Sequence, residues 1–234
     1  MANKTQSSYR QVFNALLELE PSLHPVSILS DFEVACLNSC EAVFSDAIHR
    51  GCFFHFVQCI WRQVQSSGLQ ERYAKEEEFA HEVKKLAALA FIPVDDVTSA
   101  FEQLTDSEFY KENDNCLHPL IDYFEDTWIG RLKRGGNRRS PKFPIRLWNC
   151  YETIIDEIPR TNNSDEGWHN GFSSLLQAQH STIWKFIDGL KKEQSLQAVN
   201  ISQCLAGRTG KKKRKYSILD SRILTGVQEY NKLD

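Results

Sequence analysis

Hydrophobic positions along most of the chain recur every three to four residues, which is the period of an amphipathic helix. The first such segment is 9–19, and two prolines, Pro21 and Pro25, follow it. Residues 26–31 (VSILSD) are instead short, apolar and partly β-branched, which is typical of a buried strand. The helical period resumes directly after Asp31. The pattern therefore predicts a strand that runs straight into a helix, with Asp31 at the junction.

A second strand-to-helix unit follows the first. Residues 47–52 (AIHRGC) have an extended pattern, and 54–64 return to the helical period. From 69 to 158 helical segments dominate, and no segment there has a convincing strand pattern. A capped helix start near Asn163 precedes a long amphipathic helix over 183–205. We therefore predict an α/β fold with a large all-helical insertion.

The composition adds limits to this picture. With 41% hydrophobic and 25% charged residues, the 234-residue chain is typical of a soluble globular protein. Apolar runs stay below the roughly 18 residues of a membrane span, and the polar first residues argue against a secretory signal. An odd number of cysteines, seven, favours reduced thiols in the cytosol or nucleus. Because the net charge is −3, any binding to nucleic acid must come from local basic patches.

Two acidic residues, Asp31 and Glu166, lie at positions that are compatible either with metal binding or with a helix capping motif. Asp31 falls at the carboxyl end of a predicted strand, where a carboxylate can hold Mg²⁺. The same segment also reads as a capping box, with Ser30 as the N-cap and Glu33 reaching back. Likewise Asn163 can cap the next helix with Glu166 at its third position. Spacing alone favours capping over metal binding at both places.

The stretch RGCFFHF contains a C-x-x-H pair, Cys52 and His55. A structural zinc site needs four ligands, usually from two such pairs. No second pair has the required spacing, so zinc is not expected. The alternative is that Cys52 is a small buried hydrophobe and His55 a hydrogen-bonded histidine beside the core. The isolated candidates for further zinc ligands are His49, Cys59, His169 and His180.

Residues 130–146 form the first strongly basic segment. It contains seven cations and no acid, and its glycines and Pro141 predict a loop. Phosphate contacts from such a loop would depend on salt, whereas the alternative is a solvated flexible loop. Trp128 and Trp148 border the segment and are expected to anchor the core. The candidate DNA-binding residues are Arg131, Lys133, Arg134, Arg138, Arg139, Lys142 and Arg146.

A second basic run, KKKRK, follows the long helix. Five consecutive cations do not pack into a core, so the run is expected to be exposed. Such clusters are typical of nuclear localisation signals or nucleic-acid patches, and the alternative is a solubilising linker. We expect a nuclear signal, formed by Lys211, Lys212, Lys213, Arg214 and Lys215.

Seven segments, in order, resemble the animal branch of Mutator-like element (MULE) transposases. They are SDFEVACLNSCEAVF, HRGCFFHFVQCIWRQVQ, LAALAFIPVDDV, YFEDTWIGR, FPIRLWNCYE, RTNNSDEGWHNGF and IWKFIDGLKKEQ. Each motif is weak alone, but their order makes the resemblance specific. It covers roughly 9–194, which is most of the chain.

The resemblance implies a ribonuclease-H-like core interrupted by a helical insertion. It also implies a D-D-E set of carboxylates that binds two divalent ions, Mg²⁺ or Mn²⁺, for DNA cleavage and strand transfer. On this basis Asp31 matches the second Asp and Glu166 the final Glu. Cys52 and His55 match the family's C-x-x-H, and His55 would support the acidic site or contact DNA.

The chain departs from the family because neither the first Asp nor the opening strands can be identified in it. We therefore expect a partial ribonuclease-H-like core over 1–68, followed by the helical insertion over 69–158. The chain is expected to return to the core over 159–206, with a basic segment and tail over 207–234. The sheet edge left unpaired would need a partner chain or a second copy to cover it.

Three functions remain open from these residues. The first is a domesticated, catalytically inactive transposase derivative that binds DNA in the nucleus. The second is a protein-interaction module that keeps the fold without binding DNA. The third is an active transposase whose amino-terminal part lies outside this chain. Whether the chain is an enzyme is therefore open, and no membrane association is expected.

Overall fold

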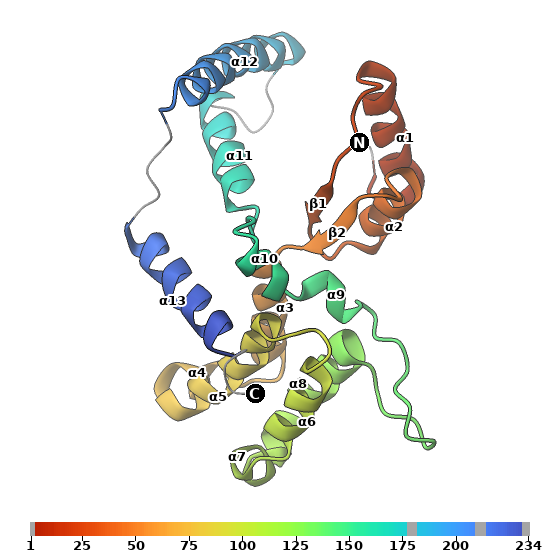
Figure 1. The fold of residues 1–234 in the computed structure, drawn as a ribbon, viewed down its shortest axis with the longest axis vertical. Coiled ribbons are helices and arrows are strands. Elements are labelled where there is room, and N and C mark those ends of the chain that lie inside the picture. Colours follow the sequence, from red (N-terminus) through yellow and green to blue (C-terminus); the bar gives the residue numbers. More distant parts are fainter. Residues whose placement is uncertain (1–2, 177–181, 209–213, 231–234) are drawn as a thin grey trace. The chain divides into compact units, whose positions relative to one another are not determined.

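The computed structural model describes residues 3–176, 182–208 and 214–230, apart from the side chains of 163–166 and 214–216. The described chain is mostly helical and contains one small sheet of two parallel strands (Figure 1). It divides into two compact units, one formed by 1–161 with 223–234 and the other by 162–222. Of the helices in the described ranges, none is both long and apolar enough to cross a membrane.

Two strand-to-helix units open the first compact unit, as the hydrophobic pattern predicts. Strand β1 (Ser27–Ser30) precedes helix α2 (Val34–Val43), and strand β2 (Ile48–Gly51) precedes helix α3 (Phe53–Ser66). The strands are parallel and in register from Ser27 opposite Ile48 to Ser30 opposite Gly51. Both predicted strands and the predicted helix over 54–64 are confirmed.

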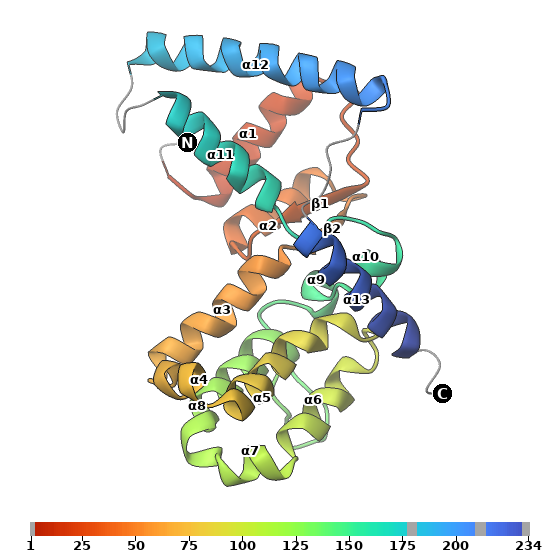
Figure 2. The same cartoon turned by 90° about the vertical axis from the view of Figure 1, so that its left-hand side faces the viewer.

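The predicted helix over 9–19 is also confirmed, as α1 (Gln6–Leu19). It packs on α2 beside the two strands (Figure 2). Ser39 of α2 is fully buried, and its hydroxyl donates to the Gln6 carbonyl at 2.9 Å. The Phe13 and Phe44 rings meet edge to face at 5.6 Å. This contact gives α1 and α2 a small apolar interface of their own.

The helical part of the first unit packs against α3 rather than standing apart from it. The apolar side of α3 buries Phe56, Ile60 and Val64 in a core that is shared with the later helices. These later segments are α4 (Gln70–Lys75), α5 (Glu77–Ala88), η1 (Leu89–Phe91), α6 (Val97–Thr105), α7 (Glu108–Glu112), α8 (Asp114–Phe124), the π-helical η2 (Glu125–Ile129), α9 (Ile145–Trp148) and α10 (Tyr151–Ile155).

Aromatic side chains form the centre of this core. Phe56 stacks on Trp148 at 4.8 Å between ring centroids and meets Trp128 edge to face at 4.9 Å. Both tryptophans are fully buried, and the Trp148 indole N–H donates to the Trp128 carbonyl at 3.2 Å. The expectation that Trp128 and Trp148 anchor the core is therefore confirmed.

The last turns of helix α13 (Arg214–Tyr230) belong to the first unit. Helix α13 buries Val227 against Tyr151 and Ile154. The Tyr230 hydroxyl donates to the Asp96 carboxylate at 3.0 Å. The end of α13 is therefore held by both apolar and polar contacts, although the sequence pattern suggested only a basic tail.

The second unit is built on two helices, α11 (Asn163–Leu176) and α12 (Ile183–Leu205), and α12 confirms the long helix predicted over 183–205. The Trp168 indole N–H donates to Glu193 at 2.7 Å, linking the two helices. A Cβ atom at Gly189 would lie 2.8 Å from the Leu176 side chain. Glycine at this position therefore lets α11 and α12 approach closely.

The mostly helical chain with its small parallel sheet agrees with the coarse expectation of a strand-helix start and a helical continuation. A two-stranded sheet is too small to identify a ribonuclease-H-like core. That part of the fold assignment therefore stays a prediction.

Candidate functional site

Asp31 and Cys52 follow two neighbouring strands at the same edge of the sheet. Asp31 comes directly after β1 and Cys52 directly after β2. Because the strands are parallel and Ser30 is paired with Gly51, the residues that follow the two strands must meet there. The Cys52 N–H donates to the Ser30 carbonyl at 2.8 Å, which carries the pairing to the last residue of β1.

Phe32 attaches this edge to the core. Its ring packs against Trp128 at 4.9 Å and Phe143 at 5.1 Å, both edge to face. A Cβ atom at Gly51 would lie only 2.4 Å from the Phe32 ring, so a side chain there would displace the ring. The residue next to Asp31 is thus held by the core, while the Asp31 side chain stays about half exposed.

The Asp31 carboxylate faces His55 from the first turn of α3. The Asp31 Oδ1 atom lies 2.9 Å from His55 Nδ1, and the two side chains are 51% and 21% exposed. The next residue, Phe56, is fully buried and fixes this turn of α3 in the core. The packing of Phe56 therefore fixes the position of the His55 imidazole. The imidazole can then hold the Asp31 carboxylate in one orientation by a charge-assisted contact.

The two residues of the C-x-x-H motif have different environments. Cys52 is completely buried and provides the backbone position that precedes α3, whereas His55 faces the Asp31 carboxylate. Cys52 thus behaves as the small buried hydrophobe of the simpler interpretation. Within the described part of the chain, no group of three or more His, Cys, Asp or Glu side chains could hold a metal ion.

The capping box expected around Asp31 is wrong. Helix α2 begins at Val34, so Glu33 occupies the N-cap position instead of the third helical position, and it makes no capping hydrogen bond. The Ser30 hydroxyl donates to the Asp31 carbonyl at 3.3 Å. Phe32 packs in the aromatic core, and the helix begins three residues later than a box with Ser30 as N-cap assumes.

Glu33 instead connects the sheet edge to the start of the chain. The Tyr9 hydroxyl donates to Glu33 at 2.9 Å, and the Lys4 ammonium lies 3.2 Å from the same carboxylate. Burial of the hydroxyl, together with its hydrogen bond to Glu33, raises the pKa of Tyr9 to about 12. Nothing in the local sequence pattern marked Tyr9 as a neighbour of this edge.

Two of the candidate sites include residues that the structure does not describe. Glu166 belongs to α11 in the second unit, but its side chain lies outside the described residues. Its predicted approach to Asp31 therefore stays a prediction. In the basic run, Lys211, Lys212 and Lys213 lie outside the described residues, as do the side chains of Arg214 and Lys215.

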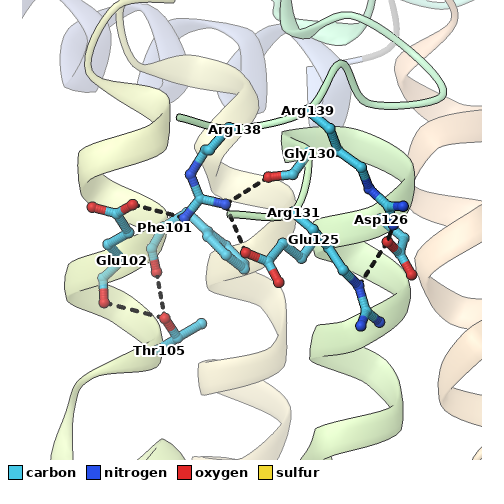
Figure 3. A network of polar contacts seen from close by, with 9 residues as sticks. All are labelled: Phe101, Glu102, Thr105, Glu125, Asp126, Gly130, Arg131, Arg138 and Arg139. Atoms are coloured by element: carbon cyan, nitrogen blue, oxygen red, sulfur yellow. Dashed lines mark hydrogen bonds and ion pairs between the residues drawn. The ribbon is translucent and has the colours of Figure 1, made fainter. Parts of the chain in front are cut away.

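The basic segment has acidic neighbours that its own sequence does not contain. Arg131 forms an ion pair with Asp122 at 3.2 Å. It also forms one with Asp126 at 2.7 Å, and Arg139 contacts the same carboxylate (Figure 3). Arg138 contacts further carboxylates from α6 and η2. Although the segment itself contains no acid, these three arginines are already paired with carboxylates from outside it. The four other candidates, all exposed, are Lys133, Arg134, Lys142 and Arg146.

One comparison with known proteins gives a match. Residues 1–59 match the MULE transposase domain family. This segment includes Asp31, Cys52 and His55, whereas Glu166 and the basic segment lie beyond it. No curated protein and no solved structure matches the chain.

Proposed function

Since residues 1–59 are related to MULE transposases, we propose that this chain is a transposase-derived DNA-binding protein. The observation that carries the proposal is the Asp31 carboxylate at the sheet edge, held 2.9 Å from His55 within the matched segment. In this proposal Asp31 is the second carboxylate of a D-D-E set and Glu166 the last. His55 is a positioning residue that orients Asp31.

The environment of Asp31 is compatible with a divalent ion. Its carboxylate is about half exposed at the carboxyl edge of a parallel sheet, and Mg²⁺ and Mn²⁺ prefer carboxylate oxygens. Asp31 and Glu166 are the residues that would hold the ion. When bound, a pair of such ions activates the attacking oxygen and stabilises the leaving oxygen in phosphodiester chemistry. The contribution of His55 is to limit the rotation of the Asp31 side chain.

We also propose that this chain does not cleave DNA by itself. Asp31 and Glu166 supply two carboxylates, and the 234 residues offer no match to the first Asp of the set. Without that carboxylate the two ions lose a shared ligand, so most of the rate enhancement is lost. An aspartate supplied from outside these residues would restore the set, and this defines the alternative of an active transposase.

A nicking assay tests the catalytic part of the proposal. The purified chain is incubated with supercoiled plasmid and either Mg²⁺ or Mn²⁺, with Asp31→Ala as the matched variant. We expect no nicking by either protein. Metal-dependent nicking by the parent chain that disappears in Asp31→Ala would show that the remaining carboxylates suffice.

DNA binding is tested separately by fluorescence anisotropy with a labelled duplex of mixed sequence. We expect weak, sequence-independent binding that decreases as salt rises, because phosphate contacts release counterions.

The nuclear signal is tested by replacing Lys211, Lys212 and Lys213 with alanine in a fluorescent fusion. Loss of nuclear accumulation is the expected result, and unchanged accumulation would remove this part of the proposal.

A protein-interaction module is the second candidate, and the sheet edge favours it. Among the described residues each strand has one hydrogen-bonded neighbour. Val26, directly before β1, is 81% exposed, and Ile48, the first residue of β2, is 55% exposed. Parallel strands are normally covered on both faces. A second copy or another chain that covers this edge would appear as a larger particle in light scattering. Absence of salt-dependent DNA binding together with self-association would favour this function.

A further inference from the structure

Residues 131–139 form a loop, as the sequence predicts, and this loop is closed into a short hairpin by one antiparallel bridge between Leu132 and Arg138. The Lys133 N–H donates to the Asn137 carbonyl at 2.8 Å, and the Arg139 N–H donates to the Arg131 carbonyl at 2.9 Å. The Gly136 N–H donates back to Lys133 at 3.0 Å, and Gly136 has a φ of +83°. A turn that ends in a left-handed glycine is a common three-residue hairpin connection.

Arg138 holds the base of this hairpin against two helical segments. One guanidinium nitrogen donates to Glu125 and to the Gly130 carbonyl, each at 2.6 Å, and the other donates to Glu102 at 2.7 Å (Figure 3). The Arg138 side chain is only 17% exposed. Because these acceptors come from α6, η2 and the hairpin entry, one side chain fixes the hairpin position.

The remaining arginines at the base are also neutralised. Arg131 faces Asp122 and Asp126, and Arg139 faces Asp126. With Arg138 included, three arginines meet four carboxylates, so the base of the hairpin has no excess positive charge. Phosphate binding by these arginines would require them to leave their carboxylate partners, which opposes the binding.

The tip of the hairpin has the opposite character. Lys133 and Arg134 are exposed, and neither forms an ion pair with another described residue. They stand on a hydrogen-bonded turn whose base is fixed by Arg138. Two cations on such a support lose less conformational freedom on binding than cations on a flexible loop.

We propose that this hairpin is a phosphate-binding element for duplex DNA, in which Lys133 and Arg134 contact the phosphates and Arg138 is a positioning residue. The proposal rests on the DNA binding proposed above and assigns it to two residues. Cationic groups without carboxylate partners are the ones that bind phosphate with the smallest cost of exchanging partners. Binding of an acidic protein surface by the same tip is an alternative outcome.

The test compares the parent chain with Lys133→Ala/Arg134→Ala. The control, Lys75→Ala/Lys111→Ala, removes two exposed lysines that are 73% and 61% exposed and already paired with carboxylates. Anisotropy of a labelled mixed-sequence duplex is measured between about 50 and 200 mM salt. Two lost phosphate contacts should flatten the slope of log K against log salt by roughly 1.8 units. The control should keep the parent slope.

The outcomes separate this inference from the proposed function. Parent binding with an unchanged slope in the tip variant overturns the phosphate-binding tip but leaves DNA binding in place. No binding by the parent chain at low salt overturns both proposals, and an acidic protein ligand would then become the candidate for the tip.

The positioning role of Arg138 is tested by hydrogen exchange in the absence of DNA. In Arg138→Ala the Lys133 amide, which is hydrogen-bonded to Asn137, should exchange faster because the hairpin base is released. Arg139→Ala is the control, since it removes an exposed arginine that contacts one carboxylate. Equal protection of the Lys133 amide in the parent and in Arg138→Ala would overturn the positioning role.

Discussion

Phe56→Ala is expected to destabilise the whole first unit, because Phe56 is where the sheet edge meets the helical core. Its ring stacks on Trp148 at 4.8 Å, meets Trp128 at 4.9 Å, and lies 6.2 Å from Phe124. Phe56 is completely buried and directly follows His55 on α3. The substitution would therefore remove a contact that joins α3 to α8, η2 and α9.

The size of the effect follows from burial. Replacing a buried phenylalanine with alanine costs about 3–5 kcal/mol, since it loses transfer free energy and leaves a cavity. For a domain of this size each kcal/mol shifts the melting temperature by about 2–4 °C. The melting temperature should therefore fall by roughly 6–20 °C, as these two ranges together imply.

Phe54→Ala is the matched control, because Phe54 lies on the same helix but is 40% exposed. Its cost should stay within about 1 kcal/mol. Thermal unfolding is followed by far-ultraviolet circular dichroism for the helices and by near-ultraviolet circular dichroism for the packed tryptophans. A melting temperature that changes equally in Phe56→Ala and Phe54→Ala would refute a single core shared by α3 and the later helices.

Two further substitutions test local features of the first unit. Gly130→Ala should cost about 1–3 kcal/mol in urea unfolding, because Gly130 has a φ of +95° and a Cβ there would lie 1.9 Å from the Arg139 carbonyl oxygen. Gly135→Ala, which meets no atom within 4 Å, should be near neutral, and an equal loss would contradict this account. The raised pKa of Tyr9 favours its neutral form in the folded state, so its contribution to stability is present below about pH 10 and lost as pH rises towards 12. Tyr9→Phe should lose less stability than the parent chain over that interval in urea unfolding, and identical pH profiles would exclude the contact with Glu33 as a cause.

Local sequence pattern was sufficient for the elements that surround the candidate site. The two strand-to-helix units, with Asp31 at the first junction, follow from runs of apolar residues and from the helical period after them. These signals involve neighbours in sequence, and here the tertiary packing agrees with them. The approach of Asp31 to His55, in contrast, was expected only from the resemblance to a family.

The capping box shows where a local motif fails. Ser30 and Glu33 have the spacing of a box, yet α2 begins at Val34. The reason is tertiary, since Phe32, which the motif places inside the helix, packs on Trp128 and Phe143 instead. A motif of four residues cannot predict this competition.

The sequence by itself determined α1, α3, α12, the two strands and the position of Asp31 at the end of β1. The tertiary structure alone decided which charges meet. Arg138 is paired with Glu102, which is 36 positions away in the chain, and the end of α13 returns to Tyr151. Helical and strand periods depend on residues a few positions apart, whereas ion pairs and core contacts depend on how distant segments pack. For this reason the charge of the 130–146 segment could be read from the sequence, but which of its cations remain available for phosphate could not.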